Sequence, residues 1–264
     1  MATKKVVPIK LAKLAKPGTA KALAPPKTRG WVTKPKPFTS VSFSRWGDWD
    51  KCPRYAHWKH ILKKPEGPKN DAMLRGIFIA EQEEAYFTGK AQGIPPDIHK
   101  AHHKLFKFAK SQKTLMVEQN WGFNRQWEPV DYFDWNNCFL RIKVDFGWQD
   151  VKKNVIHLKD NKTGKFREQD NDKYVMQLEL YTAGGAGMFP SAKGFTSELV
   201  YTDLGISYPP TEPMSYTMSE AKKLQKDWDK RFGRMVADET FRPKPGFYCS
   251  WCPYTKSKGG DCEY

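Results

Sequence analysis

The chain has 264 residues, of which 39% are hydrophobic and 14% aromatic, enough to bury the core of one large domain or two small ones. No apolar run approaches the ~20 residues that cross a bilayer, and no apolar signal segment follows the basic start. These features argue against a membrane-spanning or secreted protein and predict a soluble protein of the cytosol.

The net charge of +16 is distributed unevenly. Residues 1–40 contain ten Lys or Arg, six Pro and no acidic residue, which leaves 35 basic against 29 acidic residues, or +6, for the remainder. A Lys-, Ala- and Pro-rich segment with few large apolar side chains does not fold alone. We predict a disordered arm over 1–40 that adds non-specific affinity for phosphate, followed by one domain over 41–264. A transit peptide is the weaker alternative, because such peptides favour Arg and Ser.

The opening segment of the domain, 42–61, carries aromatic and apolar side chains at helical spacing behind a Ser-rich start. Pro53 interrupts this pattern, so we predict two short helices or one kinked helix. A loop over 65–70 follows. The side chains that set the helical spacing are Trp46, Trp49, Tyr55, Trp58 and Ile61.

Residues 71–89 predict a helix, with Asp71 as N-cap and Gly89 just past its end. Its apolar side includes a carboxylate, because Glu84 falls on that side and Glu81 lies at its edge. Such a carboxylate usually reaches solvent, but a buried metal ligand is the second interpretation. The apolar side is predicted to comprise Met73, Ile77, Ala80 and Phe87.

Strands dominate the middle of the chain. A basic helix over 97–112 precedes three predicted strands, over 115–123, 139–148 and 154–162, and the last ends in a turn at Thr163-Gly164. The order helix, three strands, helix, strand predicts an α/β domain with a small mixed β-sheet flanked by helices. The elements that complete this order are a helix over 171–189, a strand over 196–205 and a helix over 217–237.

The third predicted strand ends in a charged pair, Asp160 and Lys162, which share a face because strand side chains alternate. If this strand pairs with the preceding one as a hairpin through 149–153, Asp145 meets Asp160 on that face. Two close carboxylates repel one another unless a cation lies between them, and Mg²⁺ or Mn²⁺ suits such oxygen ligands. Lys162 would then orient a water molecule or stabilise charge on a phosphate. The alternative is a surface ion pair in a β-turn.

Three segments in this order, "RIKVD", "HLKDNKTGK" and "QLELY", resemble the PD-(D/E)XK nuclease superfamily and, within it, the RecB-like exonuclease branch. Members carry an Asp on one strand, Asp-x-Lys-Thr-Gly on the next and Gln-x-x-x-Tyr on the following helix. The segment "SFSRWGDWDKCPRYAHW" resembles the start of the same branch, so the likeness covers about 42–262. It implies a restriction-endonuclease-like α-β-β-β-α-β core. The catalytic residues it implies are Asp145 and Asp160, which bind the metal, together with Lys162, Gln177 and Tyr181.

The resemblance implies that Gln177 and Tyr181, one helical turn apart, line the cleft and place the DNA phosphate or the attacking water. The alternative is an amphipathic helix with Tyr181 packed in the core.

The chain departs from the family pattern in its first long helix. Members usually carry Gly-x-x-x-His, with the His as a metal ligand, where this chain has Gly76 and Ala80. We expect Glu84 to act as the third metal ligand. Glu81, or a site with fewer protein ligands, is the alternative. Glu118 on the first strand corresponds to a Glu of the family and either supports the site or faces solvent.

Five cysteines are present, and an odd count with three near the C-terminus does not indicate a secreted disulfide framework. Cys249, Cys252 and Cys262, with the distant Cys52, offer four thiolates for Zn²⁺ or an iron–sulfur cluster. AddB-type nucleases and the iron–sulfur nucleases of CRISPR adaptation hold a [4Fe–4S] cluster with one Cys before the nuclease core and three after it. The resemblance to them implies that cluster, with structural Zn²⁺ as the alternative. It would staple 42–62 to 241–264, whereas Cys138 is expected to be a structural thiol.

We therefore expect a Mg²⁺- or Mn²⁺-dependent deoxyribonuclease, in the first instance an exonuclease, of DNA recombination, repair or phage DNA processing. Its expected partner is DNA. A single-strand annealing protein, a helicase or another replication or recombination protein is a candidate second partner. The expected location is the cytoplasm, or the host cytoplasm or nucleoid if a phage encodes the chain. The alternative is a non-catalytic nucleic-acid-binding module that keeps the fold and the cysteine cluster, which the missing histidine favours.

Overall fold

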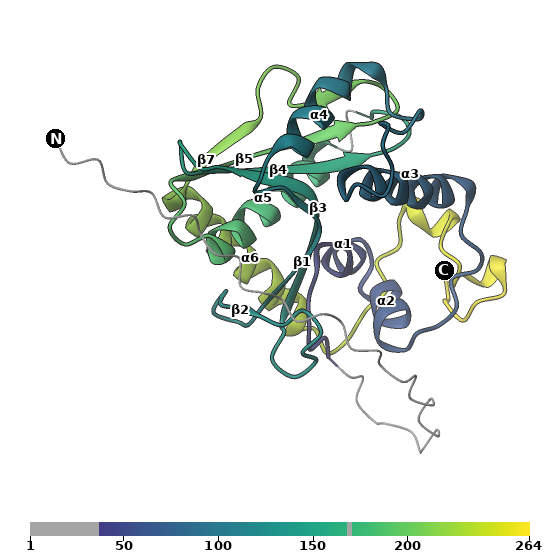
Figure 1. Cartoon of the computed structure of the whole chain (residues 1–264). Coiled ribbons are helices and arrows are strands. Elements are labelled where there is room, and N and C mark those ends of the chain that lie inside the picture. Colours follow the sequence, from purple (N-terminus) through teal and green to yellow (C-terminus); the bar gives the residue numbers. More distant parts are fainter. Residues whose placement is uncertain (1–36, 168–170) are drawn as a thin grey trace.

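The structure is a computed structural model that describes residues 37–167 and 171–264 (Figure 1). The predicted arm lies outside the described residues except for 37–40. Within that short stretch Phe38 is fully buried, and its ring packs edge-on against Phe241 with the ring centroids 5.9 Å apart. The folded domain therefore begins a few residues earlier than predicted, because an aromatic side chain near the boundary joins the core.

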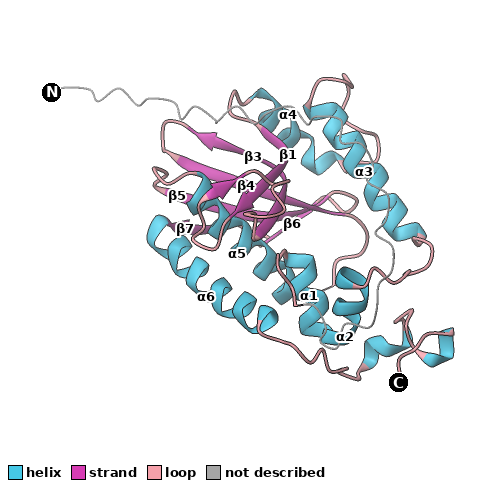
Figure 2. Cartoon of the chain, turned by 90° about the horizontal axis from the view of Figure 1, so that it is seen from below, coloured by secondary structure: helices cyan, strands magenta, loops and turns pink. Residues whose placement is uncertain are grey.

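A seven-stranded mixed sheet forms the centre of the molecule (Figures 1 and 2). Its order is β2-β1-β3-β4-β5-β6, and β7 pairs with the half of β5 that β6 leaves free. Strands β4 and β5 pair in parallel, whereas the other named pairs are antiparallel. The α/β class with a mixed sheet is thus confirmed. The strands are β1 (Met116–Phe123), β2 (Pro129–Val130), β3 (Leu140–Asp150), β4 (Val155–Lys162), β5 (Gly194–Tyr201), β6 (Ile206–Tyr208) and β7 (Met214–Thr217).

Helices cover both faces of the sheet. Figure 1 shows α5 and α6 on one face and α4 on the other, with α3 beside it. The N-terminal pair, α1 and α2, is interrupted at Cys52 and Pro53, as predicted. Within the described residues, none of the helices combines the length and the apolar composition of a membrane span. The helices are α1 (Phe43–Lys51), α2 (Pro53–Ala56), α3 (Asp71–Phe87), α4 (His103–Ser111), α5 (Asn171–Met188) and α6 (Met218–Val236), with a π-helical turn (His57–Ile61) and short 3-10 turns (Lys100–His102, Phe247–Ser250, Lys256–Lys258).

Helix α5 approaches the sheet closely because glycines occupy the side that faces it. A Cβ atom on Gly184 would lie 2.6 Å from Cδ1 of Ile142, and one on Gly187 would lie 2.6 Å from the carbonyl oxygen of Trp127. Any larger side chain at these positions would push the helix outward. The close approach brings the start of α5 within side-chain reach of the end of β4.

Strand β3 does not keep regular alternation along its length. Ile142 points toward α5, yet Phe146, four residues later, stacks on Phe87 of α3 on the opposite face, with the ring centroids 5.0 Å apart. Regular alternation would place both side chains on one face. The β1–β3 ladder omits the pair Glu118–Asp145 between them, and Glu118 has a φ of +49°. The irregularity therefore lies at Asp145, one of the predicted site residues.

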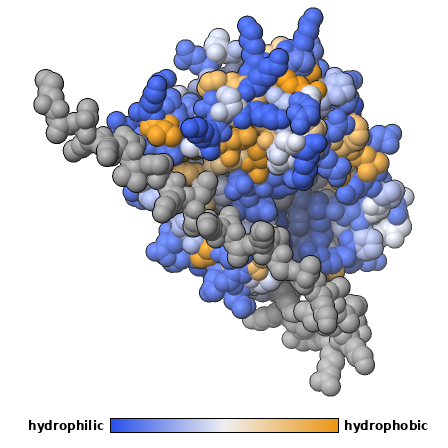
Figure 3. Space-filling model, viewed as in Figure 1, coloured by the Kyte–Doolittle hydropathy of each residue, from blue (hydrophilic) through white to orange (hydrophobic). Residues whose placement is uncertain are grey.

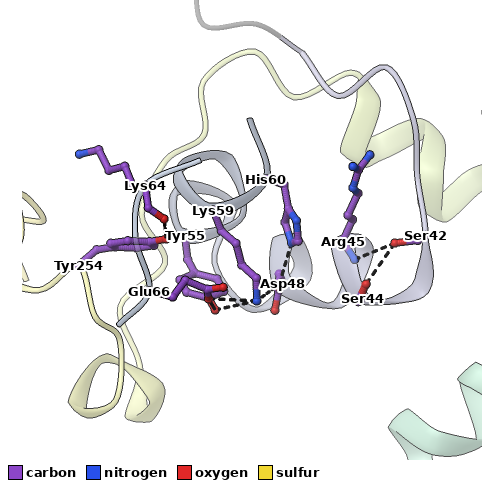
Figure 4. A network of polar contacts seen from close by, with 10 residues as sticks. All are labelled: Ser42, Ser44, Arg45, Asp48, Tyr55, Lys59, His60, Lys64, Glu66 and Tyr254. Carbon is purple, nitrogen blue, oxygen red and sulfur yellow. Dashed lines mark hydrogen bonds and ion pairs between the residues drawn. The ribbon is translucent and has the colours of Figure 1, made fainter. Parts of the chain in front are cut away.

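The C-terminal tail packs against the N-terminal helical segment. The hydroxyl of Tyr254 donates to the carbonyl oxygen of Lys64 at 3.0 Å. Beside this contact, Nζ of Lys59 lies 3.1 Å from carboxylate oxygens of both Asp48 and Glu66 (Figure 4). The two ends of the domain therefore meet through direct protein contacts.

Candidate active site

The carboxylate of Asp160, near the end of β4, lies at the centre of the site and is 1% exposed. Its Oδ1 accepts hydrogen bonds from Tyr181 Oη and Gln177 Nε2, both at 2.8 Å. Its Oδ2 is ion-paired with Lys162 Nζ, which also donates to Gln177 Oε1 at 3.1 Å. The structure thus brings three of the predicted site residues, Lys162, Gln177 and Tyr181, together around the buried carboxylate of a fourth, Asp160.

Asp145 lies beside Asp160, where β3 and β4 separate. The ladder between these strands ends with the pair Phe146–Lys159, one residue before the two aspartates would pair. Beyond that point the backbone amide of Asn161 donates to Asp145 Oδ2 at 2.8 Å. Burial and, after it, the negative charge of Asp160 raise the pKa of Asp145 to about 8. The β3–β4 hairpin therefore places Asp145 and Asp160 next to one another, as the strand register expected from the sequence predicted.

The third carboxylate at this point is Glu83, and the placement expected for Glu84 was wrong. Glu83 is 5% exposed, and its Oε2 accepts a hydrogen bond from Asn161 Nδ2 at 2.5 Å. The Glu84 side chain is 43% exposed and lies 3.8 Å from Lys90 Nζ. Glu81, the alternative, is also exposed.

The error has its origin in the rotational phase of α3. One residue turns an α-helix by about 100°, so a shift of one position moves a carboxylate to another face. Met73 and Ile77, predicted to be buried, are exposed. The N-cap is likewise one residue earlier than predicted, because Asn70 Oδ1 accepts from the amide of Met73 at 2.9 Å. The side of α3 that is buried against the sheet is instead marked by residues at spacing i, i+4 and i+7. These residues are Ile79, Glu83 and Tyr86.

The site carries negative charge that the described side chains do not fully compensate. Burial and then the charge of Asp145 raise the pKa of Glu83 to about 8. Three buried oxygens, Glu83 Oε1, Asp160 Oδ2 and Asn161 Oδ1, accept no hydrogen bond from any residue that the structure describes, although Asp160 Oδ2 faces the charge of Lys162. Oxygens of this kind are the ligands that Mg²⁺ and Mn²⁺ prefer.

The candidate site suits a divalent cation because of the chemical type of its donor atoms, and not because of their present distances. Across 37–167 and 171–264, no three His, Cys, Asp or Glu side chains already stand close enough together to hold a metal ion. Glu83 and Asp160 are nevertheless two buried carboxylates with unsatisfied oxygens beside the carboxylate of Asp145, and a hard cation stabilises such a group of oxygen ligands.

These groups line a cleft of about 290 Å³ between α3 and the sheet. Figure 3 shows a hydrophilic hollow below α3. Glu118 also lines the cleft and is ion-paired with Lys143, so it borders the site instead of projecting into bulk solvent. Gly76 and Ala80 form part of the α3 wall.

Comparison with known proteins identifies the family of this chain. The family model of the PD-(D/E)XK nuclease superfamily matches residues 40–257, which is most of the chain. The chain belongs to the PD-(D/E)XK nuclease superfamily. A crystal structure named "Putative exonuclease", from Eubacterium rectale, resembles it with a TM-score of 0.42 and 14% sequence identity, over 84% of this chain and 87% of that chain. No curated protein matches. Membership in a nuclease superfamily indicates hydrolysis of phosphodiester bonds, with DNA as the substrate.

Four of the five cysteines line a second cavity of this PD-(D/E)XK chain, between α2 and the C-terminal tail. The cavity has a volume of about 220 Å³ and is bordered by Cys52, Cys249, Cys252 and Cys262. Burial raises the pKa of the Cys252 thiol, and the three neighbouring thiols raise it further. Cys138 lies elsewhere, buried next to the start of β3.

Proposed function

We propose that the chain is a divalent-metal-dependent DNA exonuclease of the RecB-like branch, acting in recombination, repair or phage DNA processing. The observation that carries this proposal is the meeting of Asp145, Asp160 and Lys162 where β3 and β4 separate, with unsatisfied carboxylate oxygens facing a cleft. Asp145, Asp160 and Glu83 are the residues that would hold the cation. When bound, the cation polarises a phosphate and lowers the pKa of a water molecule.

Lys162 would act as a positive charge in this scheme. Burial alone would lower its pKa, but attraction by Asp160 and then Asp145 outweighs burial, and the pKa of Lys162 is raised. The ammonium group therefore stays protonated near neutral pH, in position to stabilise charge on a phosphate oxygen. Gln177 and Tyr181 hold the Asp160 carboxylate in one orientation through the two hydrogen bonds at Oδ1.

Two adjacent glutamates on α3 test the assignment of the third ligand. Glu83→Gln is expected to lower the cleavage rate about 10²-fold, because it removes a buried charge that faces the proposed cation. Glu84→Gln, the matched control on the exposed side of the helix, should cleave at the wild-type rate. The measurement is the initial rate on labelled DNA in Mg²⁺. The reverse ranking of the two variants would restore Glu84 as the ligand.

Metal affinity should depend on pH, because cation and protons compete for the same oxygens. Asp145 and Glu83 both have a pKa of about 8 without metal, so each is largely protonated at pH 6. Raising the pH removes these protons. The affinity for Mg²⁺ or Mn²⁺ should therefore rise from pH 6 to 8, by about tenfold per pH unit for each proton displaced. Calorimetric titration in buffers of different ionisation enthalpy measures both the affinity and the protons released. An affinity that does not change over this range would contradict the carboxylate site.

We further propose that Cys52, Cys249, Cys252 and Cys262 hold a [4Fe–4S] cluster. In a tetrahedral zinc site all four sulfurs lie ~2.3 Å from one ion. The four thiols here line, together with other side chains, a cavity of about 220 Å³. A cluster of several atoms needs more space between its thiolates than one ion does, so the cavity supports the cluster. It would reinforce the contact between tail and N-terminal segment.

A non-catalytic DNA-binding module is the second candidate. It is favoured by Ala80, which lines the cleft where the family pattern has a histidine ligand. Cleavage assays separate the two candidates, because the module would bind DNA and leave it intact with either metal.

A further inference from the structure

A buried arginine without an ion pair among the described residues lies on β3, away from the carboxylates of the candidate active site. The side chain of Arg141 projects from the strand, and the residue is only 9% exposed. Its Nε donates to the carbonyl oxygen of Tyr132 at 2.9 Å. Its two terminal nitrogens, however, are buried and donate to no described residue. No carboxylate in the described ranges forms an ion pair with this guanidinium. A buried, unpaired charge is costly, so such a group points to a missing anionic partner.

A second arginine reinforces the positive charge at this place. Arg45, in the first turn of α1, donates through Nη1 to the carbonyl oxygen of Ser40 at 3.1 Å. It likewise has no carboxylate partner among the residues described, and Figure 4 shows its side chain pointing away from the network around Asp48. Burial and then the charge of Arg141 lower the pKa of Arg45, which indicates that the two guanidinium groups repel one another.

The start of α1 faces the same side of the sheet. Val41 bridges Leu140 in parallel, and both side chains enter the core. Their neighbours Ser42 and Arg141 therefore point to the opposite side. Ser42 is the N-cap of α1, and no acidic residue lies in the first helical turn. A helix N-terminus without nearby acid attracts anions.

An exposed aromatic ring borders the arginine. Trp135, in the loop before β3, is 74% exposed, and the guanidinium carbon of Arg141 lies 4.5 Å from the centre of its ring. Phe133 in the same loop is also exposed. Large exposed aromatic side chains beside positive charge are typical of surfaces that bind single-stranded nucleic acid, where rings stack on unpaired bases and cations hold the phosphates.

The arginine also lies in line with the active-site cleft. Arg141 and Lys143 share a face of β3, two residues or about 6.6 Å apart along the strand. Lys143 lines the cleft that contains Asp145 and Asp160. A strand of DNA that leaves the cleft along β3 would therefore reach Arg141 next.

We propose that Arg141, Arg45 and the N-terminus of α1 bind a backbone phosphate of single-stranded DNA, while Trp135 stacks on an adjacent base. This inference rests on the proposed function for the choice of DNA, and it names the single strand as the form of substrate held outside the cleft. Trp135 covers the Arg141 guanidinium in the free protein, so stacking on a base moves the ring aside and uncovers the phosphate contact.

The test is DNA binding by the full chain in EDTA, which is independent of cleavage. Fluorescence anisotropy with a labelled single-stranded 20-mer and a blunt duplex, at several salt concentrations, gives affinity and salt dependence. Arg141→Met should bind the single strand about tenfold more weakly, with a salt slope shallower by about 0.7. Trp135→Ala should weaken single-strand binding about tenfold and leave duplex binding unchanged. Arg234→Gln on α6 and Phe108→Ala on α4, both exposed, are the controls and should bind as the wild-type chain does.

Thermal unfolding separates a ligand role from a structural one. If Arg141 only stabilises the loop before β3 through its hydrogen bond to Tyr132, Arg141→Met lowers the melting temperature and leaves DNA binding unchanged. That result would overturn the proposal. If Arg141 binds a phosphate when DNA is present, the melting temperature of Arg141→Met without DNA is unchanged or higher, because the substitution removes a buried charge that has no ion pair with a described residue. Should Arg141→Met fail to fold, Arg141→Lys decides, since it keeps the charge and loses the two-pronged geometry. Wild-type binding by that variant also overturns the proposal. A chain that binds as described but never cleaves would refute the nuclease function alone.

Discussion

The Asp160→Asn variant is expected to fold and to cleave DNA at least about 10³-fold more slowly than the wild-type chain. The amide keeps an oxygen that can accept from Tyr181 and Gln177, so the hydrogen bonds at this position can persist. It removes the negative charge that faces Lys162 and the proposed cation. Lys162→Met should lower the rate by about 10²–10³-fold, as loss of one preorganised charge does elsewhere. Initial rates on end-labelled linear DNA, with circular dichroism to check folding, measure both effects.

The matched control for this pair is Asp227→Asn on α6, where the carboxylate is exposed and pairs only locally with Lys230 at 3.1 Å. It should cleave at the wild-type rate. Undiminished metal-dependent cleavage by both Asp160→Asn and Lys162→Met would remove the active site from this position.

The second large effect concerns the cysteines. The wild-type chain, purified without oxygen, is expected to be brown and to contain iron and sulfide in equal amounts. Cys252→Ser should lose both, and its melting temperature should fall, because the binding energy of such a centre contributes to folding. Elemental analysis and thermal unfolding measure the two changes. Direct contacts such as Tyr254 to Lys64 should still allow part of the tail to dock.

Cys138→Ser is the control, because this thiol is buried away from the other four. It should leave the iron content unchanged, whatever it does to stability. Colourless protein with one zinc per chain would replace the cluster by a zinc staple at the same thiols. Colourless, metal-free protein that stays equally stable with all four cysteines changed to Ser would end the proposal in both forms.

The meeting of Asp145 with Asp160 could be predicted because it depends on short-range rules. The period of two along a strand and the hairpin between 149 and 153 set which side chains face one another. The pairing of Gln177 with Tyr181 follows in the same way from one helical turn. The mixed sheet was predictable from the order of its long strands, whereas β6 and β7 were too short to show a pattern.

The parts that could not be predicted depend on tertiary packing. The phase of α3 decided between Glu83 and Glu84, and both faces of that helix carry apolar residues, so periodicity did not distinguish them. The loss of alternation in β3 lies opposite the positive φ of Glu118 on β1, and no sequence pattern predicts such a φ for a glutamate. The unsatisfied terminal nitrogens of Arg141 likewise became visible only in the structure, where they donate to no described residue.

Digestion of end-labelled linear DNA and closed circular DNA, with Mg²⁺, Mn²⁺ or EDTA, tests the central claim most directly. Our account predicts that the wild-type chain degrades the linear DNA from its ends when either cation is present and leaves the circle intact. It predicts no degradation in EDTA, and none by Asp160→Asn under any of these conditions. Intact linear DNA with both cations, or equal degradation by the wild-type chain and Asp160→Asn, would contradict metal-dependent hydrolysis at the Asp145–Asp160 site.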